Sequence, residues 1–366
     1  MKELKSRLHE EMTYLNQLIQ QSEGKHRNKN IGMGQSVTEL KRRMEKYRSF
    51  VPPDVACPPD LITRHVDDQE LKNLFGQLGI KSTVNPPLPS RRKMRPGRLI
   101  MDAKIVSRFT SDQTSVVTTG NDQAWIWNFN DRHMSLVTSD GEVIQCINTE
   151  FDVCDACVST SGDLLVTVCN GNKVKMLTKH KTFTDVYTAA DDCLTGGITT
   201  TETGNVLVTL NKVKDSKVVE ISTSGKLVRT IQYDTADNKS LFDRPWFICS
   251  NINGDIIVSD DRNKVVAVSK SGTKRFIYDG KERKLQNSFN PRYVVTDKYG
   301  NILIADYYNS AVHVLDQDGK FIKYLITGEH GCDKPFGMDI NSSDRLWLYN
   351  NGPSEVFVTK LSYNRM

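Results

Sequence analysis

The chain has 366 residues and a formal net charge of +5, with 38% hydrophobic and 25% charged residues. This length and composition fit a soluble globular protein that has one large domain, an appendage and a sizeable apolar core. No run of 18 apolar residues occurs and no apolar segment follows Met1, which argues against a transmembrane helix, a membrane partner or a secretory signal in the chain as given. We therefore expect a cytoplasmic protein whose eight cysteines are reduced thiols.

The positive charge is concentrated near the N-terminus. Residues 1–98 contain 19 Lys and Arg against 11 Asp and Glu, whereas residues 99–366 contain 30 against 33. The sequence therefore predicts a basic front segment joined to a nearly neutral body. This balance argues against a bulk nucleic-acid-binding surface on the body, while a local basic patch remains open.

Residues 1–49 are predicted to form a helical oligomerisation segment. Within residues 1–22 the apolar residues follow a 3.5-residue spacing, interrupted at Glu11, that is typical of a coiled-coil seam. The seam residues through which we expect self-association are Leu4, Leu8, Leu15 and Leu18. The alternative is a solvated amphipathic helix that folds back on the body.

Residues 50–97 have the composition of a linker. Prolines punctuate both ends of the segment, and a short amphipathic helix is expected over residues 68–78. The segment runs into the basic stretch Arg91–Arg98, for which a solvated linker is the simplest interpretation. The alternative is a nuclear-localisation or polyanion-binding tract.

Residues 98–366 contain an internal repeat. The segments Gly254–Gly272 and Gly300–Gly319 match in pattern, with their first glycines 46 residues apart and their last glycines 47 apart. Weaker copies place equivalent turns near residues 141, 181 and 225. Six copies, each with four strands in roughly 40–50 residues, predict an all-β six-bladed β-propeller.

The last copy ends after three strands, and a strand-rich piece at Leu99–Phe109 precedes the first full inner strand at residues 115–119. If that piece supplies the outer strand of the last blade, the ring closes without an open edge. We therefore predict a closed propeller rather than an open solenoid.

The repeat resembles the NHL repeat, most closely in GNILIADYYN from Gly300 to Asn309 and next in Gly254–Gly272. The other copies depart from it, with Phe129, Cys169 and Asn211 near the position of Asp306. The predicted coil and the linker pattern YRSFVPP…LKNLFGQL are similar to those of tripartite-motif proteins, especially the expanded NHL-type set of molluscs and other invertebrates.

This resemblance implies an NHL-type propeller behind a coiled coil, and the substrate-binding half of a RING-type E3 ubiquitin ligase. Such proteins often carry RING and B-box zinc domains before the coil, but here only His9 and His26 precede Cys57, so no such array is present in the chain as given. The sequence therefore predicts a non-catalytic scaffold or adaptor. A fragment of a complete ligase is an alternative.

The cysteines, aspartates and asparagines that could suggest a metal or catalytic site are interpreted here as structural residues. Cys154 and Cys157 form a lone CxxC, and a structural zinc site would need four ligands. Asp260 and Asp306, each followed by an Asn at 263 or 309, recur once per copy, which is typical of a turn-stabilising device. The channel is expected to be lined mostly by Val, Ile, Thr and Ser. No catalytic motif, metal site or cofactor is predicted.

One face of the predicted propeller carries the candidate binding site. Loops between the second and third strands of each blade share that face with the connections between blades, and they bring cations and aromatic side chains to it. The proposed residues are Arg132, Lys173, Lys214, Arg262, Lys264, Lys281, Arg283, Lys284, Arg292, Tyr307 and Tyr308. We expect a protein partner on this face; the alternative is RNA, bound through phosphate contacts and base stacking.

Overall fold

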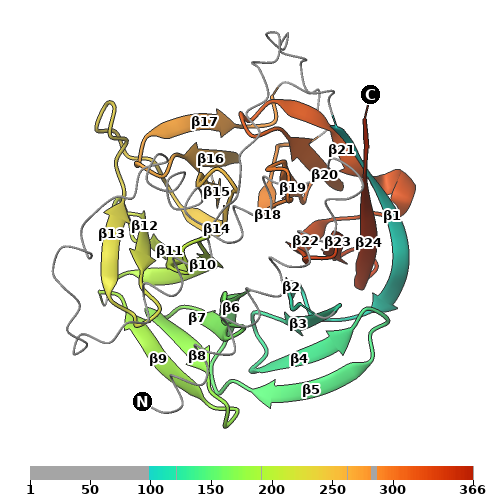
Figure 1. Cartoon of the computed structure of the whole chain (residues 1–366), viewed down its shortest axis with the longest axis horizontal. Helices are drawn as coiled ribbons and strands as arrows, with labels where there is room; N and C mark the ends of the chain where they lie inside the picture. Colours follow the sequence, from blue (N-terminus) through green and yellow to red (C-terminus); the bar gives the residue numbers. More distant parts are fainter. Residues whose placement is uncertain (1–98, 121, 191, 262, 282–286, 366) are drawn as a thin grey trace, which may run out of the picture. The chain divides into compact units, whose positions relative to one another are not determined.

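The computed structural model describes residues 99–365 except residues 121, 191, 262 and 282–286 (Figure 1). The predicted coiled coil at residues 1–49 and the linker at residues 50–97 lie outside the described residues, so both remain predictions. Within the described part, no helix is long and apolar enough to span a membrane.

The described chain forms six four-stranded antiparallel sheets arranged as blades around a central axis, as predicted (Figure 1). Blade 1 contains β2 (Ser115–Thr118), β3 (Gln123–Trp127), β4 (His133–Thr138) and β5 (Val143–Asn148), and blade 2 contains β6 (Val153–Val158), β7 (Leu164–Val168), β8 (Lys173–Leu177) and β9 (Phe183–Thr188). Blade 3 contains β10 (Leu194–Thr200), β11 (Val206–Asn211), β12 (Lys217–Ile221) and β13 (Leu227–Ile231), and blade 4 contains β14 (Pro245–Ser250), β15 (Ile256–Asp260), β16 (Lys264–Val268) and β17 (Lys274–Tyr278). Blade 5 contains β18 (Pro291–Thr296), β19 (Ile302–Asp306), β20 (Ala311–Leu315) and β21 (Phe321–Ile326). Blade 6 contains β22 (Pro335–Ile340), β23 (Arg345–Asn350), β24 (Glu355–Arg365) and β1 (Leu99–Thr110), and a 3₁₀ turn, η2 (Gly328–His330), precedes it.

The middle strands of the blades are rich in Val, Ile and Leu because both of their faces are covered by neighbouring blades. All residues of β15, β19 and β20 are buried, so apolar residues fill both faces of these strands instead of alternating with polar ones. The outer strands β5 and β17 instead alternate between exposed and less exposed residues. The core therefore lies between blades, and the inner strands are held rigidly around the axis.

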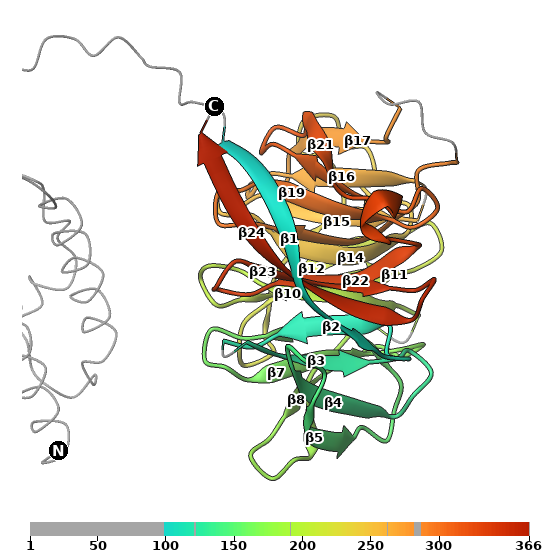
Figure 2. The same ribbon diagram turned by 90° about the vertical axis from the view of Figure 1, so that its right-hand side faces the viewer.

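The ring closes through a strand from the other end of the described chain. β1 pairs with β24 in antiparallel register from Leu99 opposite Arg365 to Thr110 opposite Glu355, with an irregularity between Ile105 and Ser107. Figure 2 shows β1 running alongside β24 at the outer edge of blade 6. The predicted closure by residues 99–109 is confirmed, and it joins the first and last blades through backbone hydrogen bonds.

The five turn landmarks that set the repeat period share one backbone conformation. Residues 141, 181, 225, 272 and 319 all have positive φ, from 61° at Lys181 to 90° at Gly272. Glycine is required at position 225, because a Cβ there would lie 1.8 Å from the carbonyl oxygen of Val186 in the preceding blade. The spacing predicted from the sequence is therefore the blade spacing.

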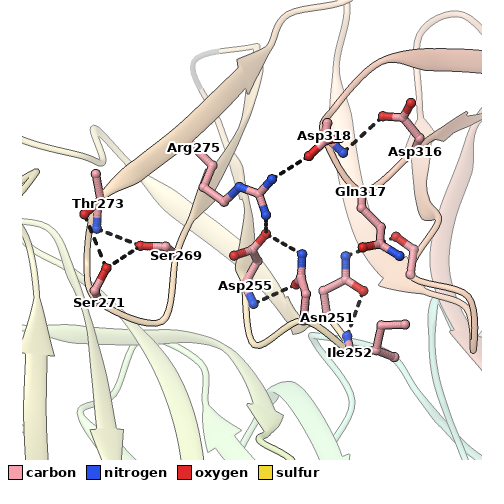
Figure 3. A network of polar contacts seen from close by, with 12 residues as sticks. Asn251, Ile252, Asp255, Ser269, Ser271, Thr273, Arg275, Asp316, Gln317 and Asp318 are labelled. Atoms are coloured by element: carbon pink, nitrogen blue, oxygen red, sulfur yellow. Dashed lines mark hydrogen bonds and ion pairs between the residues drawn. The ribbon is translucent and has the colours of Figure 1, made fainter. Parts of the chain in front are cut away.

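Polar side chains tie these turns together between blades 4 and 5 (Figure 3). Arg275 on β17 donates to Asp255 of its own blade and to Asp318 of the next blade, at 2.5 Å in each case. Asn251 also reaches the next blade, where its Nδ2 donates to the carbonyl oxygen of Gly300 at 3.1 Å. This side of the ring, which we call the lower face, is thus held together by its own hydrogen bonds.

Candidate functional site

The opposite side, the upper face, is formed by the loops between second and third strands and by the connections between blades. Backbone hydrogen bonds join these two groups of loops. Asp261 N–H donates to the carbonyl of Arg244 at 3.1 Å, and Tyr307 N–H donates to the carbonyl of Asn290 at 3.0 Å. The prediction that these loops share a face is confirmed.

Asp260 and Asp306 are fully buried and fix the connections that lead into their blades. Asp260 accepts the backbone N–H groups of Asp243 at 2.8 Å and Arg244 at 3.1 Å, and Asp306 accepts that of Asn290 at 3.0 Å. A structural role was predicted and is confirmed. The expected donors were wrong, because the backbone N–H groups come from the preceding connection rather than from the turn of each Asp itself.

The accompanying Asn residues behave differently from each other. Asn263 has the expected left-handed backbone, with φ of 58°, but in blade 5 this conformation belongs to Ser310, with φ of 51°. Asn309 instead uses its side chain: Nδ2 donates to Asp306 at 2.8 Å, and Oδ1 accepts the N–H of Asn287 at 3.0 Å. The expectation for Asn309 was therefore wrong in its mechanism.

Blade 6 contains an equivalent clamp that the sequence analysis missed. Asn350 occupies the same register position on β23 as Asp306 does on β19. Its Oδ1 accepts the N–H of Asp333 at 2.6 Å, and its Nδ2 donates to the carbonyl of Gly331 at 2.8 Å. The amide of Asn350 holds the connection as the carboxylate of Asp306 does. A search for the Asp pattern therefore did not find it.

The same registers correct the positions assigned to the weaker copies. The residues at the register position of Asp306 are Asn128, Val168 and Leu210, rather than Phe129, Cys169 and Asn211. Each assignment was displaced by one residue. A local pattern match could not fix the register, because blades 2 and 3 have an apolar residue at this position and blade 1 has an amide, whose Nδ2 donates to the carbonyl of Asp112 at 3.2 Å.

Three inner strands are irregular where they begin, at the upper end of the central channel, which we call the mouth. The pairing of β14, β18 and β22 shifts between the first and fourth residue of each strand. The second residues are Trp246, Arg292 and Phe336, all of them partly buried. A bulge of this kind is a common way to redirect a side chain at a binding surface.

Six aromatic side chains gather at the mouth. This aromatic cluster consists of Phe129, Trp246, Phe247, Tyr293, Tyr307 and Phe336. Phe247 and Tyr293 form a stacked pair with ring centroids 3.7 Å apart, and Phe336 meets each of them edge-on at 5.9 Å. Phe129 and Tyr307 pack against Phe336 at 5.6 and 6.2 Å. The six rings thus pack on one another as one apolar cluster.

Arg292 is the cation at the centre of this cluster. Its guanidinium carbon lies 5.5 Å from the ring centre of Tyr307 and 5.7 Å from that of Phe336. The exposed Tyr308 packs against Tyr307 with ring centroids 5.5 Å apart. The structure therefore brings together three of the predicted site residues, Arg292, Tyr307 and Tyr308.

The other described cations of the predicted site are distributed over several blades, and most of them are paired. The pairs are Arg132 with Asp152 (3.4 Å), Lys173 with Asp185 (2.5 Å), Lys264 with Asp243 (2.6 Å) and Lys281 with Asp279 (2.5 Å). Lys214 is exposed in the loop between β11 and β12. Arg262, Arg283 and Lys284 lie outside the described residues.

Two carboxylates occupy the channel below the aromatic cluster, contrary to the expected Val, Ile, Thr and Ser lining. Tyr293 on β18 donates its hydroxyl to Asp155 Oδ1 at 3.0 Å, although Asp155 belongs to β6 on the opposite side of the ring. Asp155 Oδ2 also accepts the N–H of Ile198 at 2.9 Å. Asp339 on β22 accepts both the N–H and the hydroxyl of Thr118 at 2.7 Å.

Burial makes these carboxylates weak acids. It raises the pKa of Asp155 to about 7 from an ordinary value of 3.8, despite the hydrogen bonds that favour the charged form. Burial also raises the pKa of Asp339. These groups could not be predicted from sequence spacing, because Asp155 and Tyr293 are 138 residues apart and meet only when the ring closes.

The CxxC cysteines are both buried in β6, beside Asp155. Burial raises the pKa of Cys157 well above its usual value, which makes it a poor metal ligand or nucleophile. Among the described residues, no group of three or more His, Cys, Asp or Glu side chains is arranged to hold a metal ion.

No family model and no curated protein matches the sequence. Solved structures with a similar fold include a protein named as a candidate gluconolactonase (11% identity, TM-score 0.55, covering 73% of this chain and 94% of that chain). They also include regucalcin from Agrobacterium tumefaciens, described as calcium-binding (13%, 0.55, 72% and 96%), and a streptogramin B lyase (15%, 0.50, 73% and 98%). These likenesses agree with the β-propeller fold and show nothing beyond the fold.

The calcium named for regucalcin does not fit the channel of this chain. Asp155 and Asp339 each accept hydrogen bonds from backbone N–H groups and hydroxyls, and burial favours their neutral forms. Ca²⁺ takes six to eight oxygen ligands, mostly charged carboxylates and carbonyls. The two channel carboxylates are thus hydrogen-bonding groups that join blades.

Proposed function

We propose that this chain is a non-catalytic scaffold or adaptor that binds a protein partner on the upper face of its propeller. The observation that carries the proposal is the pairing of Arg132, Lys173, Lys264 and Lys281 with carboxylates. A surface that binds RNA needs unpaired cations, since its affinity comes largely from phosphate contacts. A face of mixed, mutually paired charges favours a protein partner.

The mouth of the channel has the residue types that dominate binding energy at protein interfaces. Trp, Tyr and Arg are enriched at such positions, and Trp246, Tyr307 and Arg292 lie together there. Tyr308 adds an aromatic ring with 52% of its surface exposed. The paired charges around the mouth then form the polar rim of the interface.

The proposal retains the relationship to tripartite-motif NHL proteins that the repeat and linker indicate. A coiled coil at residues 1–49 would join several propellers, so that weak binding at each mouth adds up to high avidity. In this setting the chain would present a substrate within a ubiquitin-ligase pathway in the cytoplasm.

The test compares protein capture with RNA binding, using the full chain. We expect a partner recovered from extract of the source organism to be lost with Tyr307→Ala/Tyr308→Ala and kept with the lower-face control Tyr299→Ala. A 20-nucleotide RNA should bind only weakly in fluorescence polarisation between about 50 and 200 mM salt. Tight RNA binding that weakens steeply with salt, and is lost in the double variant, would contradict the proposal.

A further inference from the structure

One cation of the upper face differs from the others in its electrostatic surroundings. Asp261 is the only carboxylate of the described residues within 4.0 Å of Arg292, and it lies at that limit. The other oxygen of Asp261 is 3.1 Å from Nη1 of Arg244, so that carboxylate is already engaged. The charge of Arg292 is therefore less neutralised than that of the paired cations around it, so it can attract an incoming anionic group.

The side chain of Arg292 is also incompletely hydrogen-bonded. Its Nε is buried and has no hydrogen-bond partner, while 25% of the side-chain surface remains exposed at the mouth. A buried donor without a partner costs free energy that a suitable acceptor would recover. The guanidinium thus has one face on protein and an accessible edge with unused N–H groups.

The neighbouring rings hold this guanidinium in place before any ligand arrives. Tyr307 and Phe336 lie 5.5 and 5.7 Å from its central carbon, within the range of cation–π contacts. Asn351 in turn donates to the hydroxyl of Tyr307 at 2.9 Å, which fixes that ring. A pre-oriented guanidinium loses less conformational entropy when it forms a two-pronged contact.

We infer that Arg292 and the aromatic cluster form a subsite for an Asp or Glu side chain of the partner, flanked in the partner sequence by aromatic or aliphatic residues. The inference rests on the proposed function and names the chemistry of the partner. The guanidinium would bind the carboxylate through two parallel N–H···O bonds. The rings of Trp246, Phe129 and Phe336 would receive the flanking apolar side chains.

The charges around the mouth favour a single carboxylate over a polyanion. Asp261 lies beside Arg292, and Asp243, Asp279 and Asp152 lie among the paired cations of the same face. A phosphate dianion or a nucleic-acid strand would meet these carboxylates as well as Arg292. One weakly paired guanidinium beside apolar rings instead matches one monoanionic side chain with apolar neighbours.

Two degenerate peptide pools test the inference on the full chain. Both have the form acetyl-X-X-Z-X-X-amide, with X drawn from Phe, Leu and Ala, and Z is Glu in one pool and Gln in the other. We expect the wild-type chain to bind the Glu pool about tenfold more tightly at low salt, the ratio typical of one charge-assisted hydrogen-bonded pair. Mass spectrometry of the recovered peptides measures this preference.

Three variants assign the preference to its residue. Arg292→Met should abolish the preference for Glu, and Arg292→Lys should leave a reduced one, since it keeps the charge without the planar fork. Arg345→Met is the matched control, because it makes the same change at a partly exposed position of the lower face, and it should keep the full preference. The Lys variant serves as the readout if the Met variant fails to fold.

The outcomes separate this inference from the proposed function. Equal recovery of both pools, recovery of neither, or a preference that survives Arg292→Met overturns the carboxylate subsite. Loss of partner capture in the Tyr307→Ala/Tyr308→Ala chain would still support the proposed function in each of those cases. Tighter binding of a phosphoserine pool or of the 20-nucleotide RNA through Arg292 would also overturn the inference.

Discussion

Asp155 is the residue whose ionisation should be visible in the stability of the whole ring. It accepts hydrogen bonds from Tyr293 on the opposite blade and from Ile198 on the adjacent one. Burial raises its pKa to about 7 in the folded chain, compared with 3.8 for an ordinary Asp. Between pH 3.8 and about pH 7, Asp155 is therefore protonated in the folded chain and ionised in the unfolded chain.

The sign of the pH dependence follows from this difference. The contribution of Asp155 to the free energy of unfolding is greatest below about pH 4 and declines as the pH rises to about 7, by at most roughly 4 kcal/mol. Asp155→Asn cannot ionise and should remove this part of the slope. Denaturant unfolding at about pH 5 and pH 8 measures it; identical pH slopes for the variant and the wild type would rule out the ionisation we describe.

The buried clamp Asp306 makes a second prediction at the same scale. Asp306→Ala removes the side-chain acceptor of the buried N–H of Asn290 and one of the three acceptors of Asn309 Nδ2. We expect the free energy of unfolding to fall by about 2–4 kcal/mol. The control Asp318→Ala, which removes an exposed partner of Arg275, should cost less than about 1 kcal/mol. Comparable losses in the two variants would argue against the clamp.

The strands show how far local sequence patterns determine this fold. The blade period and the closing strand were predicted, because turns with positive φ recur at a nearly constant spacing and the last copy lacks one strand. The register of blades 1 to 3 and the role of Asn350 were not, because an amide stands at the position of Asp306 in blades 1 and 6, and Val168 and Leu210 stand there in blades 2 and 3. Repeats specify where strands lie more strongly than which residue faces which.

The closing strand β1 makes a prediction at the scale of an element. A chain that begins at Thr114 lacks all of β1, so β24 becomes an exposed edge with unpaired backbone groups. We expect this chain to aggregate or to lose most of its stability, whereas one that begins at Gly97 should fold. Light scattering and thermal unfolding compare the two chains. Equal monomeric behaviour would show that closure by β1 contributes little.

The candidate site was only partly predictable, and the reason again lies in long-range geometry. Arg292, Tyr307 and Tyr308 were assigned to the correct face from topology alone. Trp246 and Tyr293 were missed, because bulges at the start of the inner strands decide which side chains point into the mouth. The sequence shows that a cation lies on a face but does not show whether a carboxylate from another blade neutralises it.

At the scale of the whole molecule, the predicted seam in residues 1–49 should set the number of propellers that act together. Changing Leu8 and Leu15 to Asp would place charges in an apolar seam and should convert an oligomer into a monomer. Light scattering on the full chain gives the mass directly. An unchanged mass would mean that association, if present, uses another surface.

The central claim is that partners bind at the mouth of the channel on the upper face. Amide hydrogen exchange of the full chain, with and without its captured partner, tests it most directly. We predict slower exchange at Asn128–Asp131, Tyr307–Ser310 and the start of β22, and unchanged exchange at the lower-face turn Ser269–Thr273. Protection confined to the lower face, with the loops of the mouth exchanging as in the free chain, would contradict the account.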